Sequence, residues 1–386
     1  MRHWLHRAFL AFHGAFAYCL AHAEHERARS GLPCGPSNNT VLDREERAIW
    51  WIAAARVWRL VDGIVMKPRV LIDFCDFHPG FNKADNFFHN LLKDRYDLCI
   101  CDQPDFLIYD QFGDQHKLHT GVRIFFTGES TAPDYSVCDY ALTCHHLDDP
   151  RHCRLPFYVL YGGPEPLIKA GEKPEEILAS KTRFCSFVVS GHNRRKNRNR
   201  VEFFQKLSRY KKVDSGGRLL NNIGGPIPGW SAGKLEFLRA CKFNIAFENT
   251  SIPGYTTEKI YEAMRARCLP IYWGDPLVSR DFNPRSFLNR ADFPSDEALI
   301  EKIIELDRDD AKYLEYARQP FFHQDKPSEY FDRERLVNFF ERIFSTPITP
   351  NGQRKRLFSP GRWVMAKKYH RHALAFLDES ETATTK

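Results

Sequence analysis

A carboxylate and an ammonium group stand side by side in the segment "GYTTEK", where Glu258 and Lys259 follow two threonines. Either Thr256 or Thr257 can cap a helix that begins there. The start of such a helix offers free N–H groups and a positive dipole end to an anion, and Lys259 adds a charged donor. The spacing therefore predicts a phosphate site, with Glu258 accepting a bond from a ribose hydroxyl. In the alternative interpretation, Glu258 only complements the helix dipole and Lys259 is solvated.

A second cluster of positive charge, "RRKNRNR", covers Arg194 to Arg200 and follows a predicted strand. Most of this loop is expected to be solvated, but Arg200 begins the predicted helix "RVEFFQKL" and can be fixed in its first turn. A second cation at a second helix start suits a pyrophosphate. Nucleic-acid binding is the rival interpretation, but it favours aromatic residues among the charges, and the loop contains none.

A further carboxylate, Glu129 in "FFTGES", lies at the end of a predicted strand. There it can face a cleft and act as a general base, provided that burial or neighbours raise its pKa. An exposed loop-tip glutamate is the alternative. The acidic run "DRDD", Asp307 to Asp310, could clamp a metal ion, but its polar helical surroundings favour a solvated helix face. No G-x-G-x-x-G follows a strand, and no G-x-x-x-x-G-K-[ST] occurs.

These residues are set among alternating strand and helix patterns, which indicate βαβ units and parallel sheets. A chain of 386 residues is long enough for two domains. The predicted strands cover 69–75, 96–102, 105–110, 121–129, 139–144, 183–190, 242–248 and 269–274. The predicted helices cover 45–66, 82–95, 200–210, 231–240 and 257–267, and residues 295–345 are predicted to be helical throughout.

The domain organisation follows from the Gly-, Pro- and charge-rich stretch 166–181, which is the best linker candidate. It separates a first Rossmann-like domain, 46–165, from a second one, 182–345. Residues 1–45 form an N-terminal extension that is helical or a targeting segment. Residues 346–386 form a basic tail that could lie on an anionic membrane surface. Two such α/β domains place a ligand cleft at the carboxyl ends of their strands.

The net charge of +7 favours anionic partners such as nucleotides, nucleic acid or lipid headgroups. Eleven cysteines occur, but there is no C-x-x-C, and several lie inside apolar runs where they behave as small hydrophobes. This pattern favours a reducing, cytoplasmic compartment. The apolar run Ala8 to Ala21 is shorter than a membrane-spanning helix requires, although an anchor or signal role is left open.

The segment "FENTSIPGYTTEKIYEAMRARCLPIYWGDP" closely resembles the signature segment of the α-1,3/1,4-fucosyltransferase family, above all its bacterial members. Two further stretches, "RVEFF" with "VDSGG" and "IFFTGESTAPDYSVCDYAL", are similar to other family motifs and occur in the family's order. The resemblance covers about 68–345. It implies two Rossmann-like domains of the GT-B type and a metal-independent, inverting transfer from GDP-β-L-fucose to an acceptor oligosaccharide or glycoconjugate, with O3 of GlcNAc as the expected position.

The resemblance also implies roles for single residues. By motif position, Arg200 and Lys259 would hold the pyrophosphate and Glu258 the ribose. Glu248, Asn249 and Tyr255 would line the donor pocket, and Glu129 would deprotonate the acceptor hydroxyl.

Two departures from the family pattern and two rival functions follow. The loop before Arg200 is longer than in the bacterial members, which leaves Arg198 as an alternative to Arg200. The paired cysteines of the animal enzymes' C-terminal region are lacking, which favours a cytoplasmic bacterial type, with the Golgi membrane as the alternative for a eukaryotic chain. The rival functions are a same-fold enzyme with another nucleotide sugar, and a non-catalytic binder of glycans or nucleic acid.

Overall fold

The computed structural model describes residues 67–191, 197–228 and 232–345. The predictions for the N-terminal extension, the helix 45–66, the basic tail and its membrane contact, and Arg194 to Lys196 lie outside the described residues. Among the helices of the described ranges, none is long and apolar enough to cross a membrane.

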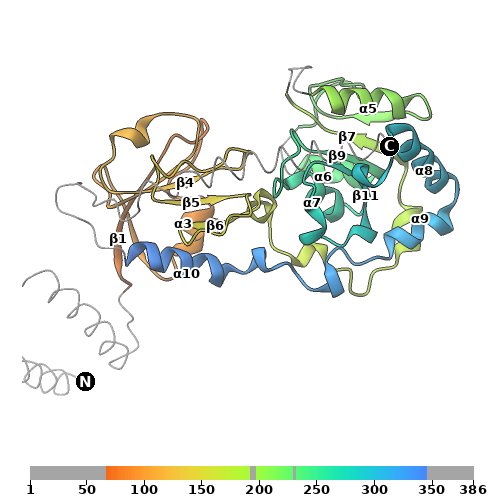
Figure 1. The fold of residues 1–386 in the computed structure, drawn as a ribbon. Helices are drawn as coiled ribbons and strands as arrows, with labels where there is room; N and C mark the ends of the chain where they lie inside the picture. The colour runs from red at the N-terminus through yellow and green to blue at the C-terminus, as the bar shows by residue number, and fades with distance from the viewer. Residues whose placement is uncertain (1–66, 192–196, 229–231, 346–386) are drawn as a thin grey trace, which may run out of the picture. The chain divides into compact units, whose positions relative to one another are not determined.

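The first sheet contains strands that are all parallel, in the order β2-β1-β3-β4-β5-β6 (Figure 1). Its strands are β1 Arg69–Cys75, β2 Asp97–Ile100, β3 Phe106–Tyr109, β4 Val122–Phe126, β5 Tyr140–Thr143 and β6 His152–Arg154. Every residue of β3 is buried, as expected of a central strand in a parallel sheet with both faces covered.

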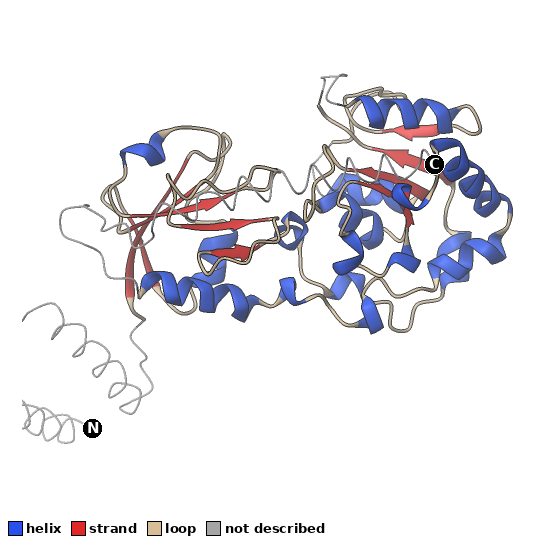
Figure 2. Cartoon of the chain, in the orientation of Figure 1, coloured by secondary structure: helices blue, strands red, loops and turns tan. Residues whose placement is uncertain are grey.

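The second sheet is also parallel throughout, in the order β11-β10-β9-β7-β8. Its strands are β7 Arg183–Phe187, β8 Val213–Ser215, β9 Cys241–Phe247, β10 Leu269–Trp273 and β11 Leu288–Asn289. All seven residues of β9 are buried. The predicted fold class, two parallel α/β sheets, is therefore confirmed (Figure 2).

The helices are α3 Phe87–Leu92, α4 Pro174–Ala179, α5 Arg198–Ser208, α6 Ala232–Arg239, α7 Glu258–Arg265, α8 Asp296–Arg308, α9 Asp310–Ala317 and α10 Arg333–Phe344. The prediction of continuous helix over 295–345 is wrong at Asp309, whose extended backbone separates α8 from α9, and for residues 318–332. Pro320 and Pro327 lie in this stretch, and Gln324 and Asp325 have left-handed backbone angles, φ +54° and +57°. A proline removes a helical hydrogen bond and a left-handed residue breaks the helical path, so only short 3₁₀ turns form here.

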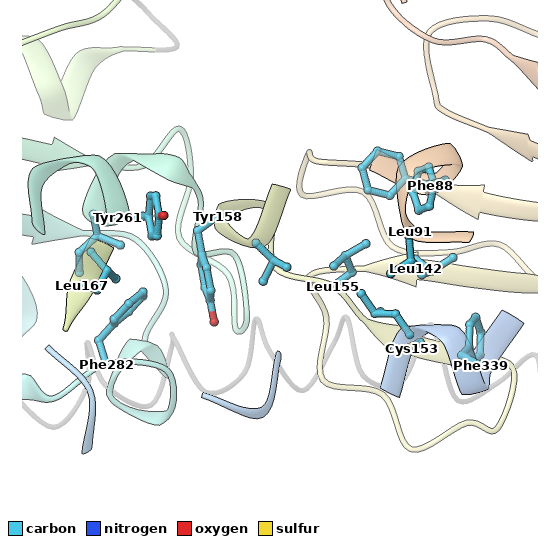
Figure 3. Packing of buried hydrophobic residues seen from close by; sticks show 14 of the residues in the cluster. Phe88, Leu91, Leu142, Cys153, Leu155, Tyr158, Leu167, Tyr261, Phe282 and Phe339 are labelled. Atoms are coloured by element: carbon cyan, nitrogen blue, oxygen red, sulfur yellow. The ribbon is translucent and has the colours of Figure 1, made fainter. Parts of the chain in front are cut away.

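A hydrophobic core runs from the first sheet to α7 (Figure 3). On the first sheet it includes Phe88 of α3, whose ring centroid lies 6.0 Å from that of Phe340 in α10. Helix α10 belongs to the 182–345 segment in sequence but packs its aromatic face against the first sheet. Further along, Tyr158 and Tyr261 are fully buried, and the Tyr261 hydroxyl donates to the Gly163 carbonyl at 2.8 Å. The chain between the two sheets is thereby packed directly onto α7.

Candidate active site

The loop from β9 to α7 is held from inside by Glu248, the first residue after β9. Its side chain is fully buried, and its carboxylate accepts bonds from the backbone N–H of Thr257 at 2.8 Å and from the Thr257 hydroxyl at 2.7 Å. Thr257 is the N-cap of α7, but its hydroxyl makes no capping bond to the helix. Glu248 thus holds the start of α7 from inside the protein.

Glu258 and Lys259 occupy the first turn of α7, as predicted. The Lys259 ammonium lies 3.0 Å from a Glu248 carboxylate oxygen and 3.4 Å from one of Glu258. Burial would lower the pKa of Lys259, but these two carboxylates outweigh it and hold that pKa above its usual value. Burial would likewise raise the pKa of Glu258, but Lys259 and Lys234 bring it below its usual value. Both groups are therefore charged at neutral pH.

Arg200 lies in the first turn of α5 and only 7% of its surface is exposed. Within the described ranges its guanidinium has no hydrogen-bond or ion-pair partner. Burial lowers the pKa of Arg200, and the charges of Glu248, Tyr255 and Glu258 oppose this shift. Arg200 also depresses the pKa of Lys259. Two cations therefore lie close together at the start of α7. A buried guanidinium without a partner is energetically unfavourable, and binding of an anion would remove this cost.

Arg198, the alternative to Arg200, is placed differently. Its side chain is 77% exposed and its Nε lies 2.7 Å from the Glu202 carboxylate one turn further along α5. The geometry therefore assigns the buried cation position to Arg200.

Tyr255 links the loop before α7 to the loop after β4. Its hydroxyl donates to the Glu129 carboxylate at 3.2 Å and accepts a longer bond, 3.4 Å, from the exposed Asn249 amide. Tyr255 itself is only 2% exposed. Burial and the carboxylates of Glu248 and Glu129 raise its pKa, so it remains a neutral donor. The structure therefore brings Glu129 against the same loop that carries Glu258 and Lys259.

Asp110 was missed by the sequence analysis, although it follows β3 just as Glu129 follows β4. It is 5% exposed and accepts a bond from the Gln111 N–H at 2.7 Å. Burial raises its pKa to about 6, and the nearby charge of Glu129 adds to this effect. The carboxyl ends of neighbouring parallel strands meet at one sheet edge, which is the signal that could have found it.

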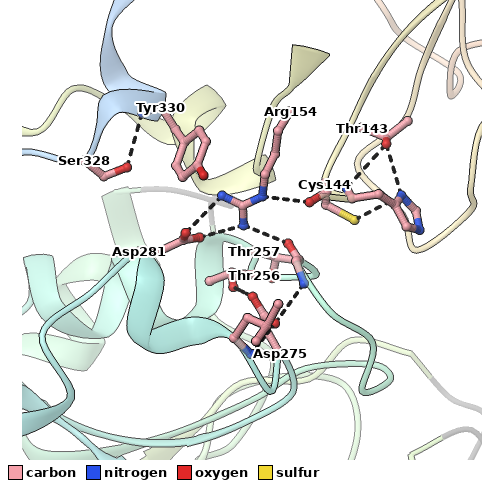
Figure 4. A network of polar contacts seen from close by, with 12 residues as sticks. Thr143, Cys144, Arg154, Thr256, Thr257, Asp275, Asp281, Ser328 and Tyr330 are labelled. Carbon is pink, nitrogen blue, oxygen red and sulfur yellow. Dashed lines mark hydrogen bonds and ion pairs between the residues drawn. The ribbon is translucent and has the colours of Figure 1, made fainter. Parts of the chain in front are cut away.

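Arg154, at the end of β6, was also missed and lies at the centre of a buried network (Figure 4). Its guanidinium makes two bonds to Asp281, at 2.9 and 2.8 Å, and donates to the Gly254 carbonyl at 3.2 Å. Asp275 holds the other side of the same loop, accepting from the Gly254 N–H and the Thr256 hydroxyl, both at 2.8 Å. The loop before α7 is thus clamped from several sides.

The acidic run Asp307 to Asp310 is a solvated helix face only in part: the side chains of Asp309 and Asp310 are 42% and 70% exposed, whereas that of Asp307 is buried. Asp307 is 6% exposed and accepts from the Tyr210 hydroxyl at 2.9 Å and from Lys211 at 3.0 Å. Asp309 caps α9. Across the described ranges, no three His, Cys, Asp or Glu side chains are grouped so that they could hold a metal ion.

Two family models match this chain, and between them they cover both sheets. Residues 72–161 match the Alpha-(1,3)-fucosyltransferase FucT N-terminal domain, and residues 178–328 match Glycosyltransferase family 10 (fucosyltransferase) C-term. The chain belongs to glycosyltransferase family 10. The matched ranges contain Glu129 in the first model and all the predicted donor-site residues in the second.

Relatives in family 10 align with this chain over only part of their length. Alpha-(1,3)-fucosyltransferase FucT of Helicobacter pylori is 31% identical over 296 residues, which is 66% of this chain and 60% of that protein. The human 4-galactosyl-N-acetylglucosaminide 3-alpha-L-fucosyltransferase FUT6 is 35% identical over 161 residues, 41% of this chain and 43% of that protein. The chain thus spans about half the length of these relatives.

Solved structures agree with the family 10 assignment. A crystal structure of an alpha1,3-fucosyltransferase superposes with a TM-score of 0.63 at 26% identity, covering 74% of this chain and 92% of that one. A crystal structure of an alpha1,3-fucosyltransferase with GDP-fucose superposes with a TM-score of 0.60 at 26% identity, covering 74% of this chain and 94% of that one. The fold is therefore the GT-B arrangement expected from the sequence.

Proposed function

We propose that this protein is a fucosyltransferase that moves L-fucose from GDP-β-L-fucose to a hydroxyl of an acceptor glycan. The observation that carries the proposal is the buried guanidinium of Arg200, which has no partner among the described residues and lies near Lys259 at the start of α7. Two cations and a helix start suit a diphosphate. The relatives named as fucosyltransferases, and the alpha1,3-fucosyltransferase solved with GDP-fucose, support fucose and GDP as the groups transferred and released.

On the donor side, Arg200 and Lys259 bind the pyrophosphate of GDP-fucose and Glu258 accepts from the ribose. Tyr255 and Asn249 line the pocket, and Glu248 fixes Thr257 and Lys259 from behind. Negative charge grows on the pyrophosphate as its bond to fucose breaks. Fixed cations at that position stabilise the transition state more than the bound donor, typically by a few kcal/mol for each group. They thereby supply the charge stabilisation that a divalent ion gives in other transferases, so we propose a metal-independent reaction.

On the acceptor side, Glu129 removes the proton of the acceptor hydroxyl while its oxygen attacks C1 of fucose. The bond from C1 to the pyrophosphate oxygen breaks, GDP leaves, and the configuration at C1 inverts because base and leaving group stand on opposite faces. The bond from the Tyr255 hydroxyl holds the Glu129 carboxylate in one orientation.

The acceptor position that we propose is O3 of GlcNAc, giving an α-1,3 linkage. The names of the H. pylori and FUT6 relatives specify this linkage, whereas the human relative FUT3 is named as a 4-alpha-L-fucosyltransferase.

Two variants test the proposed roles of Lys259 in binding and of Glu129 in proton transfer. Lys259→Ala should weaken GDP binding by about 10- to 100-fold, because a charge-assisted contact to phosphate is lost. Glu129→Gln should leave GDP affinity unchanged and lower kcat by about 10²- to 10⁴-fold, because only proton transfer is lost. Calorimetry with GDP and steady-state rates with N-acetyllactosamine measure the two quantities.

Glu176→Gln is the matched control for Glu129, because Glu176 is an exposed glutamate on α4 whose carboxylate pairs with Lys173. It should change neither GDP affinity nor kcat. The proposal fails if Glu129→Gln turns over at the wild-type rate, or if Lys259→Ala binds GDP as tightly as wild type.

A further inference from the structure

A polar pocket lies at the edge of the first sheet, with a cavity volume of about 500 Å³. Its walls come from the loop after β5, from the edge strand β6, and from α10 with the turn before it. None of the predicted donor-site residues lines it, and neither does Glu129. A volume of this size lies within the usual range for small-ligand sites and accommodates a monosaccharide.

Arg335 of α10 forms part of this pocket without a carboxylate partner in the described ranges. It donates through Nη1 to the Cys153 sulfur at 3.0 Å and through Nη2 to the Arg154 carbonyl at 2.7 Å. Its Nε is buried and has no hydrogen-bond partner. Bonds to neutral acceptors leave the charge of the guanidinium uncompensated, which is unfavourable in a partly buried position. An oxyanion in the pocket would supply that compensation.

The charges around Arg335 favour an anion as well. Arg342 lies two turns further along α10, on the face that lines the same pocket. Two histidines of the wall, His146 and His152, are kept neutral. Burial is the main cause that lowers the pKa of each to about 3, and the charge of Arg154 acts in the same direction on both. The Nε2 of His146 is buried without a partner. The two histidines therefore add no charge, and the positive charge of this part of the wall comes from the arginines.

The remaining polar groups of the wall suit hydroxyl groups. Asp148 and Glu329 are exposed at the pocket, and Tyr330 contributes an aromatic ring, with the Arg335 guanidinium 5.3 Å from its centroid. Carboxylates accept bonds from hydroxyls. The two carboxylates would repel a simple anion that reached them, so the ligand must place its charge near Arg335 and its hydroxyls near the carboxylates.

From this arrangement we propose that the pocket between β6 and α10 binds an anionic sugar, with its oxyanion on Arg335 and Arg342. The oxyanion is a carboxylate or a phosphate ester, and both present the same oxygens to a guanidinium fork. The site is separate from the donor site, and it does not depend on the transferase activity proposed above.

Calorimetry on the full chain tests this proposal with matched sugars: glucuronate, glucose 6-phosphate and uncharged glucose. Ionic strength is held constant, and GDP is kept at saturation so that anions cannot enter the donor site. The same titrations are repeated on Lys259→Ala without GDP, which keeps the result interpretable if GDP does not bind. Glucuronate or glucose 6-phosphate should bind, and glucose should bind at least about tenfold more weakly. Whether glucuronate or glucose 6-phosphate binds more tightly shows whether the site prefers a carboxylate or a phosphate ester.

Arg335→Gln should weaken the anionic sugar by about tenfold or more. The matched control is Arg333→Gln, since Arg333 is exposed on the same helix and, among the described residues, donates a hydrogen bond only to the Asn90 carbonyl, at 3.2 Å. It should stay within about twofold of wild type. If Arg335→Gln does not fold, Arg342→Gln takes its place with the same expectation. The proposal is overturned if neither anionic sugar binds, if glucose binds equally well, or if the substitution leaves the affinity unchanged.

Discussion

Arg198 and Arg200 are two residues apart in α5 and have opposite environments. Residues at this spacing point to different faces of a helix, so one arginine meets solvent and Glu202 while the other turns into the protein toward Glu248, Tyr255 and Glu258. The sequence analysis could not decide between them from loop length alone. Because the two arginines differ in burial, substitution of each in turn tests whether the buried one contributes to the donor site.

Arg200→Gln should therefore weaken GDP binding by about 10- to 100-fold, because a desolvated guanidinium contributes strongly to anion binding. Arg198→Gln removes only an exposed pair and should stay within about twofold of wild type. Calorimetric titration of GDP into both variants measures this. Equal losses in the two variants would show that the donor phosphates lie elsewhere.

At the scale of elements, the loop from β9 to α7 needs a glycine at position 254. Gly254 has φ +91°, and a Cβ there would lie 2.3 Å from the Cys144 carbonyl oxygen. Its own carbonyl and N–H are both bonded, to Arg154 and Asp275. The loop can therefore neither relax its backbone nor move away from the strand end that it touches.

Gly254→Ala should lower the melting temperature and abolish transfer activity, because backbone strain of about 1–2 kcal/mol adds to a clash with a carbonyl. Gly80→Ala is the control: Gly80 has φ +88°, but a Cβ there meets nothing within 4 Å. The loss of stability in Gly80→Ala should come from backbone strain alone. Thermal unfolding of both variants decides, and equal shifts in melting temperature would contradict the role given to the clash.

The long apolar runs made most of the elements predictable from sequence. "RVLIDFC" is β1 without change, and the predicted strands at 242–248 and 269–274 differ from β9 and β10 by one residue at their ends. The strands β6, β8 and β11 were missed because they have only three, three and two residues. Segments that short carry no readable alternation, and their strand conformation comes from pairing at the sheet.

The candidate site was predictable where residues adjoin a motif and not where they meet across the fold. Glu258 and Lys259 could be placed because a helix start is a local feature. Arg154 could not, since its partner Asp281 is 127 residues away along the chain and no local pattern marks either of them. The internal position of Glu248 was also invisible, because burial depends on how β9 and β10 pair.

At the scale of the whole molecule, the Arg154–Asp281 pair ties the end of β6 to the segment after β10. Both side chains are buried, at 6% and 0% exposure. A buried pair adds little net stability compared with apolar residues, but removal of one partner leaves an uncompensated charge. The Arg95–Glu334 pair also connects distant parts of the chain, but its side chains are 49% and 60% exposed.

Arg154→Gln should therefore lower the free energy of unfolding by about 3–5 kcal/mol, because Asp281 is left buried and unpaired. Arg95→Gln should cost less than about 1 kcal/mol, since water replaces the lost contact. Urea denaturation followed by tryptophan fluorescence measures both variants. A small loss for Arg154→Gln would mean that Asp281 finds another partner and that the network is not structurally important.

We propose that the protein transfers fucose from GDP-fucose. Nucleotide release from a panel of donors tests this proposal. GDP-fucose, GDP-mannose and a set of UDP-sugars are offered with N-acetyllactosamine as acceptor, with and without a chelator of divalent ions. The account predicts release of GDP from GDP-fucose alone, together with a fucosylated product and an unchanged rate in the chelator. Turnover of another donor in preference to GDP-fucose, or no detectable binding of GDP, would contradict it.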